Sequence, residues 1–130
     1  MRAPANVFNA FLDDVRRLVV QEMNQKSLLS KEEYLKWFAR TLGANVGILH
    51  KLGLSHKVLT EQNITLDCRI VDLASVSTMK SQYEAKDDRD DAIITLSTLF
   101  MLLNDSDTSL QVTKDDLSKV FEESYKTHLS

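Results

Sequence analysis

The chain has 130 residues, of which 43% are hydrophobic and 27% charged. This composition excludes a disordered or fibrous protein and is typical of one soluble globular domain. Only three glycines and one proline occur, too few for the many tight turns of a β-sandwich or barrel, which favours an all-α fold. The single cysteine, Cys68, cannot form an internal disulfide, so we expect a reducing, cytoplasmic setting.

The net charge of −3 is unevenly distributed along the chain. Residues 1–60 carry nine lysines and arginines against five acidic residues, whereas residues 61–130 carry seven against fourteen. A basic half and an acidic half are compatible with a nucleic-acid-binding face, and equally with an ordinary scatter of charges. The longest apolar run, residues 93–103, is far shorter than the ~20 residues that span a bilayer, so we expect a buried helix and no membrane partner.

Two helices are predicted in the first half of the chain. The first covers about residues 6–24, where apolar side chains recur at the spacing of an amphipathic helix. The second begins after Ser30, whose hydroxyl suits an N-cap, and Glu33 three residues later completes a capping box. This second helical region ends by Gly53, a residue type favoured just beyond a helix C-terminus.

Three further helices are predicted in the second half. One begins after Thr60 and reaches about residue 84, although its first part, ITLDCRIV, alternates apolar and polar residues as a strand does. Another covers about residues 88–103, with Asp87 or Asp88 as its N-cap, and the last runs from Lys114 to about residue 126, capped by Thr113 and Asp116. We therefore predict an all-α, single-domain bundle of five or six helices.

Within the second helical region, the stretch FARTLGANVGILHKLG, residues 38–53, bears on function. Ala39 is a small residue where another helix could cross, Gly43 permits a sharp turn, and Asn45 could cap a following helix. The stretch resembles a helix-turn-helix, which implies that the helix from Asn45 onward enters the major groove of DNA. Gly47 departs from that pattern, because glycine costs about 1 kcal/mol relative to alanine inside a helix.

The alternative is one continuous helix through the same stretch. Ala39, Gly43 and Gly47 would then share one face at i, i+4 and i+8, and these small residues would let a neighbouring helix approach closely. An unbroken helix over residues 40–50 would remove the main support for DNA reading.

The candidate nucleic-acid-binding residues follow from that resemblance and from the basic character of the first half. In the supposed reading helix, Asn45, His50 and Lys51 would contact bases or phosphates. The basic residues around it would contact phosphates, and these are Lys31, Lys36, Arg40, His56 and Lys57.

No stretch predicts a catalytic or metal site with comparable strength, and we expect neither a metal nor a cofactor. Residues 105–116 place aspartates at several ligand positions of an EF-hand loop, but Leu110 stands where that loop needs glycine. The three histidines lack metal-binding spacing. Cys68 has no adjacent histidine or second cysteine, so a packed thiol is expected there.

The expected function is therefore that of a non-catalytic, nucleic-acid-associated helical protein with protein partners or self-association. It would be either a DNA-binding regulator or a small structural subunit of a nucleoprotein complex. Small helical subunits of CRISPR effector complexes are similar to this chain in size and class, although no motif identifies them. A protein–protein adaptor or inhibitor with no nucleic-acid role is the alternative.

Overall fold

The computed structural model describes residues 12–60, 62–104 and 110–130. These residues form four α-helices: α1 (Leu12–Gln25), α2 (Lys31–Lys51), α3 (Gln82–Leu103) and α4 (Lys114–Leu129). The long connection between α2 and α3 holds β1 (Leu54–Ser55), the short 3-10 helix η1 (Leu73–Ser75) and β2 (Ser77–Thr78). The mostly helical class is thus confirmed, but the expected five or six helices were too many, because the described residues form four.

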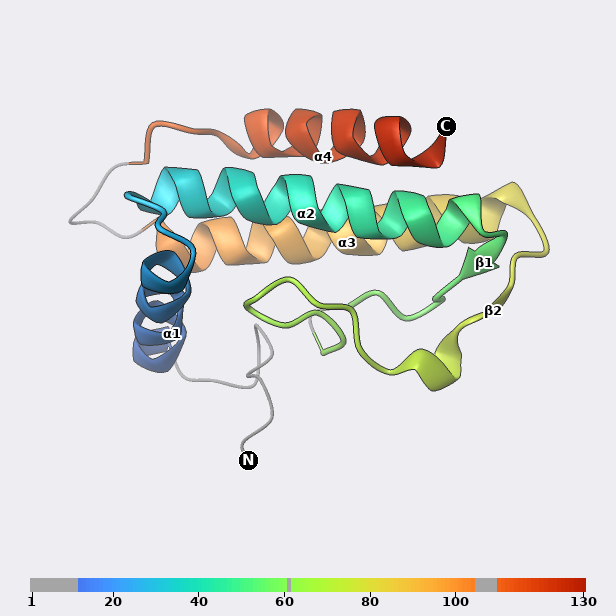
Figure 1. Cartoon of the computed structure of the whole chain (residues 1–130), viewed down its shortest axis with the longest axis horizontal. Helices are drawn as coiled ribbons and strands as arrows, with labels where there is room; N and C mark the ends of the chain where they lie inside the picture. Colours follow the sequence, from blue (N-terminus) through green and yellow to red (C-terminus); the bar gives the residue numbers. More distant parts are fainter. Residues whose placement is uncertain (1–11, 61, 105–109) are drawn as a thin grey trace.

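Three helices lie side by side along the long axis of the molecule, and α1 lies across α2 and α3 at the end where α2 begins, on the side away from α4 (Figure 1). α2 packs most extensively on α4. Gly43 lies against Phe121 and Tyr125, and Gly47, four residues later, lies against Tyr125 and Leu129, so α2 and α4 run parallel. α3 runs in the opposite direction behind α2 (Figure 1).

Buried apolar side chains from all four helices and the connection form one core. α2 is the central contributor, because its buried residues recur at three- and four-residue spacing along the whole helix. The largest fully buried apolar side chains of the core are Tyr34, Leu35, Phe38, Leu42, Leu59, Ile64, Leu96, Leu99, Leu103, Leu117 and Phe121.

The N-terminus of α4 forms the predicted capping box, whereas α2 forms the predicted Ser30 cap but Glu33 bonds to Leu29, the residue before the cap, instead of closing a box. The Ser30 hydroxyl accepts a hydrogen bond from the Glu33 backbone N–H at 3.1 Å, and the Glu33 carboxylate accepts one from the backbone N–H of Leu29 at 2.6 Å. Thr113 and Asp116 make the reciprocal pair at the start of α4, with N···O distances of 2.9 and 3.1 Å. These hydrogen bonds satisfy backbone donors that a helix start leaves free.

The small residues of α2 bring the backbone of α4 unusually close. A Cβ added to Gly43 would lie 2.4 Å from the Phe121 carbonyl oxygen, and one added to Gly47 would lie 2.7 Å from that of Tyr125. Ser124 fixes the same contact by donating a hydrogen bond from its hydroxyl to the Arg40 carbonyl at 2.6 Å. The close-approach interpretation of Ala39, Gly43 and Gly47 is confirmed for the two glycines.

The helix predicted from Thr60 to about residue 84 was wrong. β1 pairs antiparallel with β2, and Ile64 forms an isolated antiparallel bridge with Ile70. Residues 66–67 form a turn between these two residues, closed by a hydrogen bond from the Cys68 N–H to the Thr65 carbonyl. Ile64, Thr65 and Leu66 are all buried, so the alternation in ITLDCRIV marks neither a helix nor one regular strand. Cys68 has a left-handed φ of 60°, which turns the chain back.

α3 begins earlier than predicted. Its first residue is Gln82, preceded by Ser81 as N-cap, so Asp87 and Asp88 lie inside the helix and cap nothing. The Ser81 side chain makes no capping hydrogen bond; instead, Glu84 accepts a hydrogen bond from the Lys80 backbone N–H at 2.9 Å. The charged run KDDRDD is therefore helical, and Asp88 within it is fully buried.

Candidate functional site

The proposed helix-turn-helix is absent, because α2 continues without a break from Lys31 to Lys51. Gly43 and Gly47 are interior positions of that helix and face α4. The chain does not turn until Gly53, whose φ of +76° is left-handed. The resemblance over residues 38–53 was therefore misleading, and no separate reading helix begins at Asn45.

Three of the eight candidate nucleic-acid residues are engaged inside the protein. His50 is buried and contacts Tyr125 and Asp88 through its two ring nitrogens. His56 is fully buried, with its Nε2 2.7 Å from the Val71 carbonyl oxygen. Asn45 is half-buried and donates a hydrogen bond from Nδ2 to the Cys68 carbonyl at 3.2 Å. The assignment to nucleic-acid contact was therefore wrong for His50 and His56, which are buried. The Asn45 side chain is already hydrogen-bonded to the connection between α2 and α3.

The other five candidates are cations at or near the surface. Lys36, Arg40, Lys51 and Lys57 are exposed, and Lys31 is partly exposed. Lys57 lies 3.6 Å from Glu84 in an ion pair. The structure therefore keeps four exposed cations from the original set, three of them on α2.

Lys36, Arg40 and Lys51 form what we call the cationic stripe of α2. Arg40 follows Lys36 by four residues, and Lys51 follows Arg40 by eleven. Both spacings are close to whole numbers of helical turns, so the three residues share one face of α2. Acidic groups flank this stripe. Arg40 and Glu123 both line a shallow groove of about 400 Å³ between α2 and α4, and Lys36 lies close enough to Asp116 to help lower the pKa of that carboxyl, after the hydrogen bonds from Thr113.

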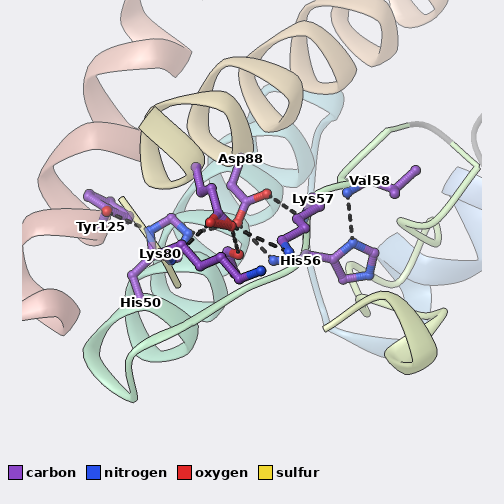
Figure 2. Close-up of polar contacts among 9 residues, drawn as sticks. His50, His56, Lys57, Val58, Lys80, Asp88 and Tyr125 are labelled. Carbon is purple, nitrogen blue, oxygen red and sulfur yellow. Dashed lines mark hydrogen bonds and ion pairs between the residues drawn. The ribbon is translucent and has the colours of Figure 1, made fainter. Parts of the chain in front are cut away.

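A buried polar network joins the C-terminal part of α2 to three other segments (Figure 2). The His50 Nε2 lies 2.9 Å from Asp88 Oδ2, and the His50 Nδ1 lies 2.7 Å from the Tyr125 hydroxyl. Asp88 also accepts hydrogen bonds from the backbone N–H groups of His56 and Lys57, at 2.9 and 2.8 Å. One carboxylate thus connects α2, α3 and the chain after β1, while Tyr125 extends the network to α4.

The protonation of this network follows from its geometry. Burial alone would raise the pKa of the Asp88 carboxyl, but the hydrogen bonds from His50, His56 and Lys57 outweigh burial and lower it. Asp88 is therefore an ionised acceptor, so His50 Nε2 carries the proton that it donates. The other ring nitrogen of His50, Nδ1, lies within hydrogen-bond distance of the Tyr125 hydroxyl, so each polar group of the three side chains has a partner.

The order carboxylate, imidazole, hydroxyl is also the order of a hydrolase triad, in which the imidazole takes a proton from the hydroxyl. Here the side chains of His50 and Asp88 are 1% and 0% exposed, and Tyr125 is 4% exposed. None of the three residues lines any of the described surface grooves. Burial raises the pKa of the Tyr125 hydroxyl, which opposes its use as a nucleophile, so the arrangement fits a structural tie better than a reaction centre.

Sequence reasoning missed this network almost entirely. His50 was considered as a nucleic-acid contact, Asp88 was assigned as a helix cap in preference to a metal ligand, and Tyr125 was not considered. One local signal was present: Asp88 falls in register with the buried residues Ala85, Ala92 and Leu96 of α3, so it lies on the face that packs inward. A carboxylate on such a face requires buried hydrogen-bond donors.

The outer face of α3 is the second feature outside the sequence predictions. Tyr83, Ile94 and Met101 are 78%, 60% and 62% exposed. With the exposed Asp87 and Asp90 and the half-exposed Ser97, they occupy positions separated alternately by four and three residues. That spacing keeps all six on one stripe of the helix, which we call the outer face of α3.

The described residues contain no cluster of three or more histidine, cysteine, aspartate or glutamate side chains placed to hold a metal ion. The EF-hand-like stretch lies partly outside the described residues, since Asp105, Asp107 and Ser109 fall in the gap at 105–109. Asp116, its last candidate ligand, accepts the capping hydrogen bond from the Thr113 backbone.

Comparisons with known proteins add no relationship to these observations. No protein-family model matches the chain, and searches of curated proteins and of solved structures returned no match. Among the helices of the described ranges, none combines the length and apolar character needed to cross a membrane.

Proposed function

We propose that this chain is a non-catalytic protein-binding subunit, and that the outer face of α3 contacts its protein partner. One observation carries the proposal: Tyr83, Ile94 and Met101 are all well exposed and lie on one stripe of one helix. Single exposed apolar residues are normal on protein surfaces, but a row of them on one face is typical of an interaction site. This is the adaptor alternative of the sequence analysis.

The unbroken α2 helix makes a DNA-binding regulator the less favoured function. A regulator of that kind reads bases with a short helix that follows a turn, and its exposed side chains reach into the major groove. Here the residues assigned to base contact include a buried His50 and an Asn45 bonded to the connection. Direct reading of DNA bases by residues 45–51 therefore loses its support.

The proposal is tested by placing charge on the outer face of α3. Ile94→Glu combined with Met101→Glu is expected to abolish co-purification of the native protein partner, because two carboxylates would have to be desolvated at the interface. Ile48→Glu is the matched control, since Ile48 is an exposed apolar residue on α2. Circular dichroism and thermal melting establish that all variants stay folded. Undiminished partner recovery by the α3 variant would contradict the proposal.

The second candidate function is that of a small structural subunit of a nucleoprotein complex, which contacts the nucleic-acid backbone. The cationic stripe of α2 favours it, because three exposed cations on one helical face can follow phosphates of a nucleic-acid backbone without reading sequence. The flanking Glu123 and Asp116 weaken the local field, so affinity for nucleic acid by the isolated chain is expected to be low.

This second candidate is tested by charge reversal along the stripe. Lys36→Glu, Arg40→Glu and Lys51→Glu together are expected to lower affinity for mixed-sequence RNA or DNA and to reduce the slope of log affinity against log salt by up to about 3. Reversal of Lys57, which pairs with Glu84, serves as the control. A salt slope that the triple substitution leaves unchanged would exclude the stripe as a nucleic-acid contact.

A further inference from the structure

The carboxylates on the outer face of α3 define the chemistry of what binds there. Asp87 and Asp90 lie on the same stripe as Ile94 and Met101 and are exposed with them. Asp90 is partly compensated, because Lys86 Nζ lies 2.6 Å from its Oδ2. A partner must therefore match two acidic positions in the N-terminal half of the face and two apolar positions in the C-terminal half.

The shape of the face matches a helix. From Tyr83 to Met101 the stripe covers 18 helical steps, or about 27 Å at 1.5 Å per residue. Alternating spacings of four and three residues are those that a second helix meets when it packs along the first. A partner helix of about 20 residues would cover the whole stripe.

A second copy of this chain fits the face poorly in either direction. In an antiparallel pair that sets Tyr83 against Met101 of the other copy, Asp90 would face the other copy's Ile94. The two Asp90 carboxylates would then lie about one helical turn apart. In a parallel pair, each aspartate would face its own equivalent. In both arrangements Asp87 and Asp90 would face no lysine or arginine of the other copy, and only Asp90 has a cation, Lys86, on its own helix. Desolvating these carboxylates at such an interface is unfavourable.

We propose that the outer face of α3 binds an amphipathic helix of a different protein, which presents apolar side chains to Ile94 and Met101 and lysine or arginine to Asp87 and Asp90. This inference rests on the proposed protein-binding function and adds the chemistry of the partner. The apolar contacts supply most of the affinity, whereas the charge pairs set orientation and exclude other helices. Asp87 and Asp90 are thus the specificity-determining residues of the face.

The test uses two designed helical peptides of 21 residues as probes. Both carry leucine at the positions that face Tyr83, Ile94 and Met101; one carries lysine and the other glutamate at the positions that face Asp87 and Asp90. The full chain is expected to bind the lysine peptide about tenfold more tightly, as measured by isothermal titration calorimetry. Asp87→Lys combined with Asp90→Lys is expected to reverse that preference, while Glu123→Lys on α4 should leave it intact.

Two outcomes overturn the inference. The first is equal binding of both peptides, or binding of neither, by the folded wild-type chain. The second is a dimer in sedimentation experiments that Ile94→Glu dissociates, because the face would then belong to a second copy. If the native partner is lost from the Ile94→Glu, Met101→Glu variant but the peptides show no charge preference, only this inference fails. If that variant keeps its partner, the proposed function fails.

Discussion

At the scale of single residues, Asp88 is a position where we expect a large effect on stability. It is a carboxylate with a fully buried side chain that accepts three hydrogen bonds from His50, His56 and Lys57. Removing one member of a buried ionic network leaves the remaining donors without an acceptor, which costs more than the network contributes as a whole.

Asp88→Ala is therefore expected to lower the free energy of unfolding by about 3–5 kcal/mol. The measurement is urea denaturation followed by circular dichroism. Asp87→Ala is the matched control, because Asp87 is the preceding residue of the same helix and is exposed, so its effect should stay within about 0.5 kcal/mol. Equal effects of the two substitutions would show that the network does not hold the bundle together.

The lowered pKa of Asp88 also predicts how stability depends on pH. A carboxyl whose folded pKa lies below its ordinary value of 3.8 stabilises the native state above that value, and the contribution is lost as pH falls through the folded pKa. Between pH 5 and pH 2.5, the wild type should therefore lose more free energy of unfolding than Asp88→Asn. Parallel pH profiles for the two proteins in urea titrations would refute this role of Asp88.

At the scale of helices, the α2–α4 contact depends on the absence of side chains. Replacing a glycine inside a helix by alanine normally raises the free energy of unfolding by up to about 1 kcal/mol, because alanine has the higher helix propensity. At Gly43 the added Cβ would lie 2.4 Å from a backbone oxygen of α4, and a backbone atom cannot move aside as a flexible side chain can.

Gly43→Ala is thus expected to destabilise the protein by about 1–3 kcal/mol, against the helix propensity of alanine. Thermal unfolding measured by calorimetry checks the sign. Ala44→Gly is the control at the neighbouring, half-exposed position, where the propensity loss of about 1 kcal/mol should appear alone. A stabilised Gly43→Ala variant would mean that the two helices are not in backbone contact.

The success of sequence reasoning differed between helices for a physical reason. α2 and α4 were predicted well because their starts are encoded locally, by hydroxyl and carboxylate side chains within three residues of each other. The start of α3 was missed although Ser81 and Glu84 have the same spacing as Ser30 and Glu33, because the helix predicted from Thr60 was extended over these residues. The Thr60 segment resembles a helix start in sequence, but a local bridge between Ile64 and Ile70 and hydrogen bonds from Tyr34 and Asn45 of α2 hold it in a non-helical conformation.

The buried network was beyond sequence reasoning because its members are far apart in the chain. His50 is 38 residues from Asp88 and 75 residues from Tyr125, and no local pattern relates them. Lys36, Arg40 and Lys51 were named as candidates from their charge, but their common face follows only from the unbroken α2 helix, which the sequence analysis had left as an alternative. Two other candidates, His50 and His56, were misassigned because their burial is a property of the assembled fold.

At the scale of the whole molecule, the connection between α2 and α3 is fixed to the helices at several points. The Tyr34 hydroxyl donates to the Leu66 carbonyl at 2.6 Å, and Asn45 donates to the Cys68 carbonyl. The Cys68 thiol is buried 3.5 Å from the Phe38 carbonyl oxygen, and burial raises its pKa. The connection is therefore expected to unfold together with the bundle.

Thiol labelling of Cys68 tests that cooperativity. The free energy of opening derived from labelling by an aromatic disulfide reagent should equal the free energy of global unfolding from urea titration, because no local opening exposes the thiol. Cys68→Ser serves as the unlabelled control. A labelling free energy several kcal/mol below the global value would instead identify the connection as an independently opening unit.

The parallel course of α2 and α4 has a further electrostatic consequence. Two parallel helices align their macrodipoles, so two partial positive charges of about half a unit gather at one end and two negative ones at the other. The first turns of both helices carry acidic pairs, Glu32 with Glu33 and Asp115 with Asp116, while their last turns carry lysine and histidine. A charged side chain offsets the dipole charge of a helix end only when it lies within about one turn of that end. We therefore expect the ionised side chains in the first and last turns of α2 and α4 to stabilise their parallel packing.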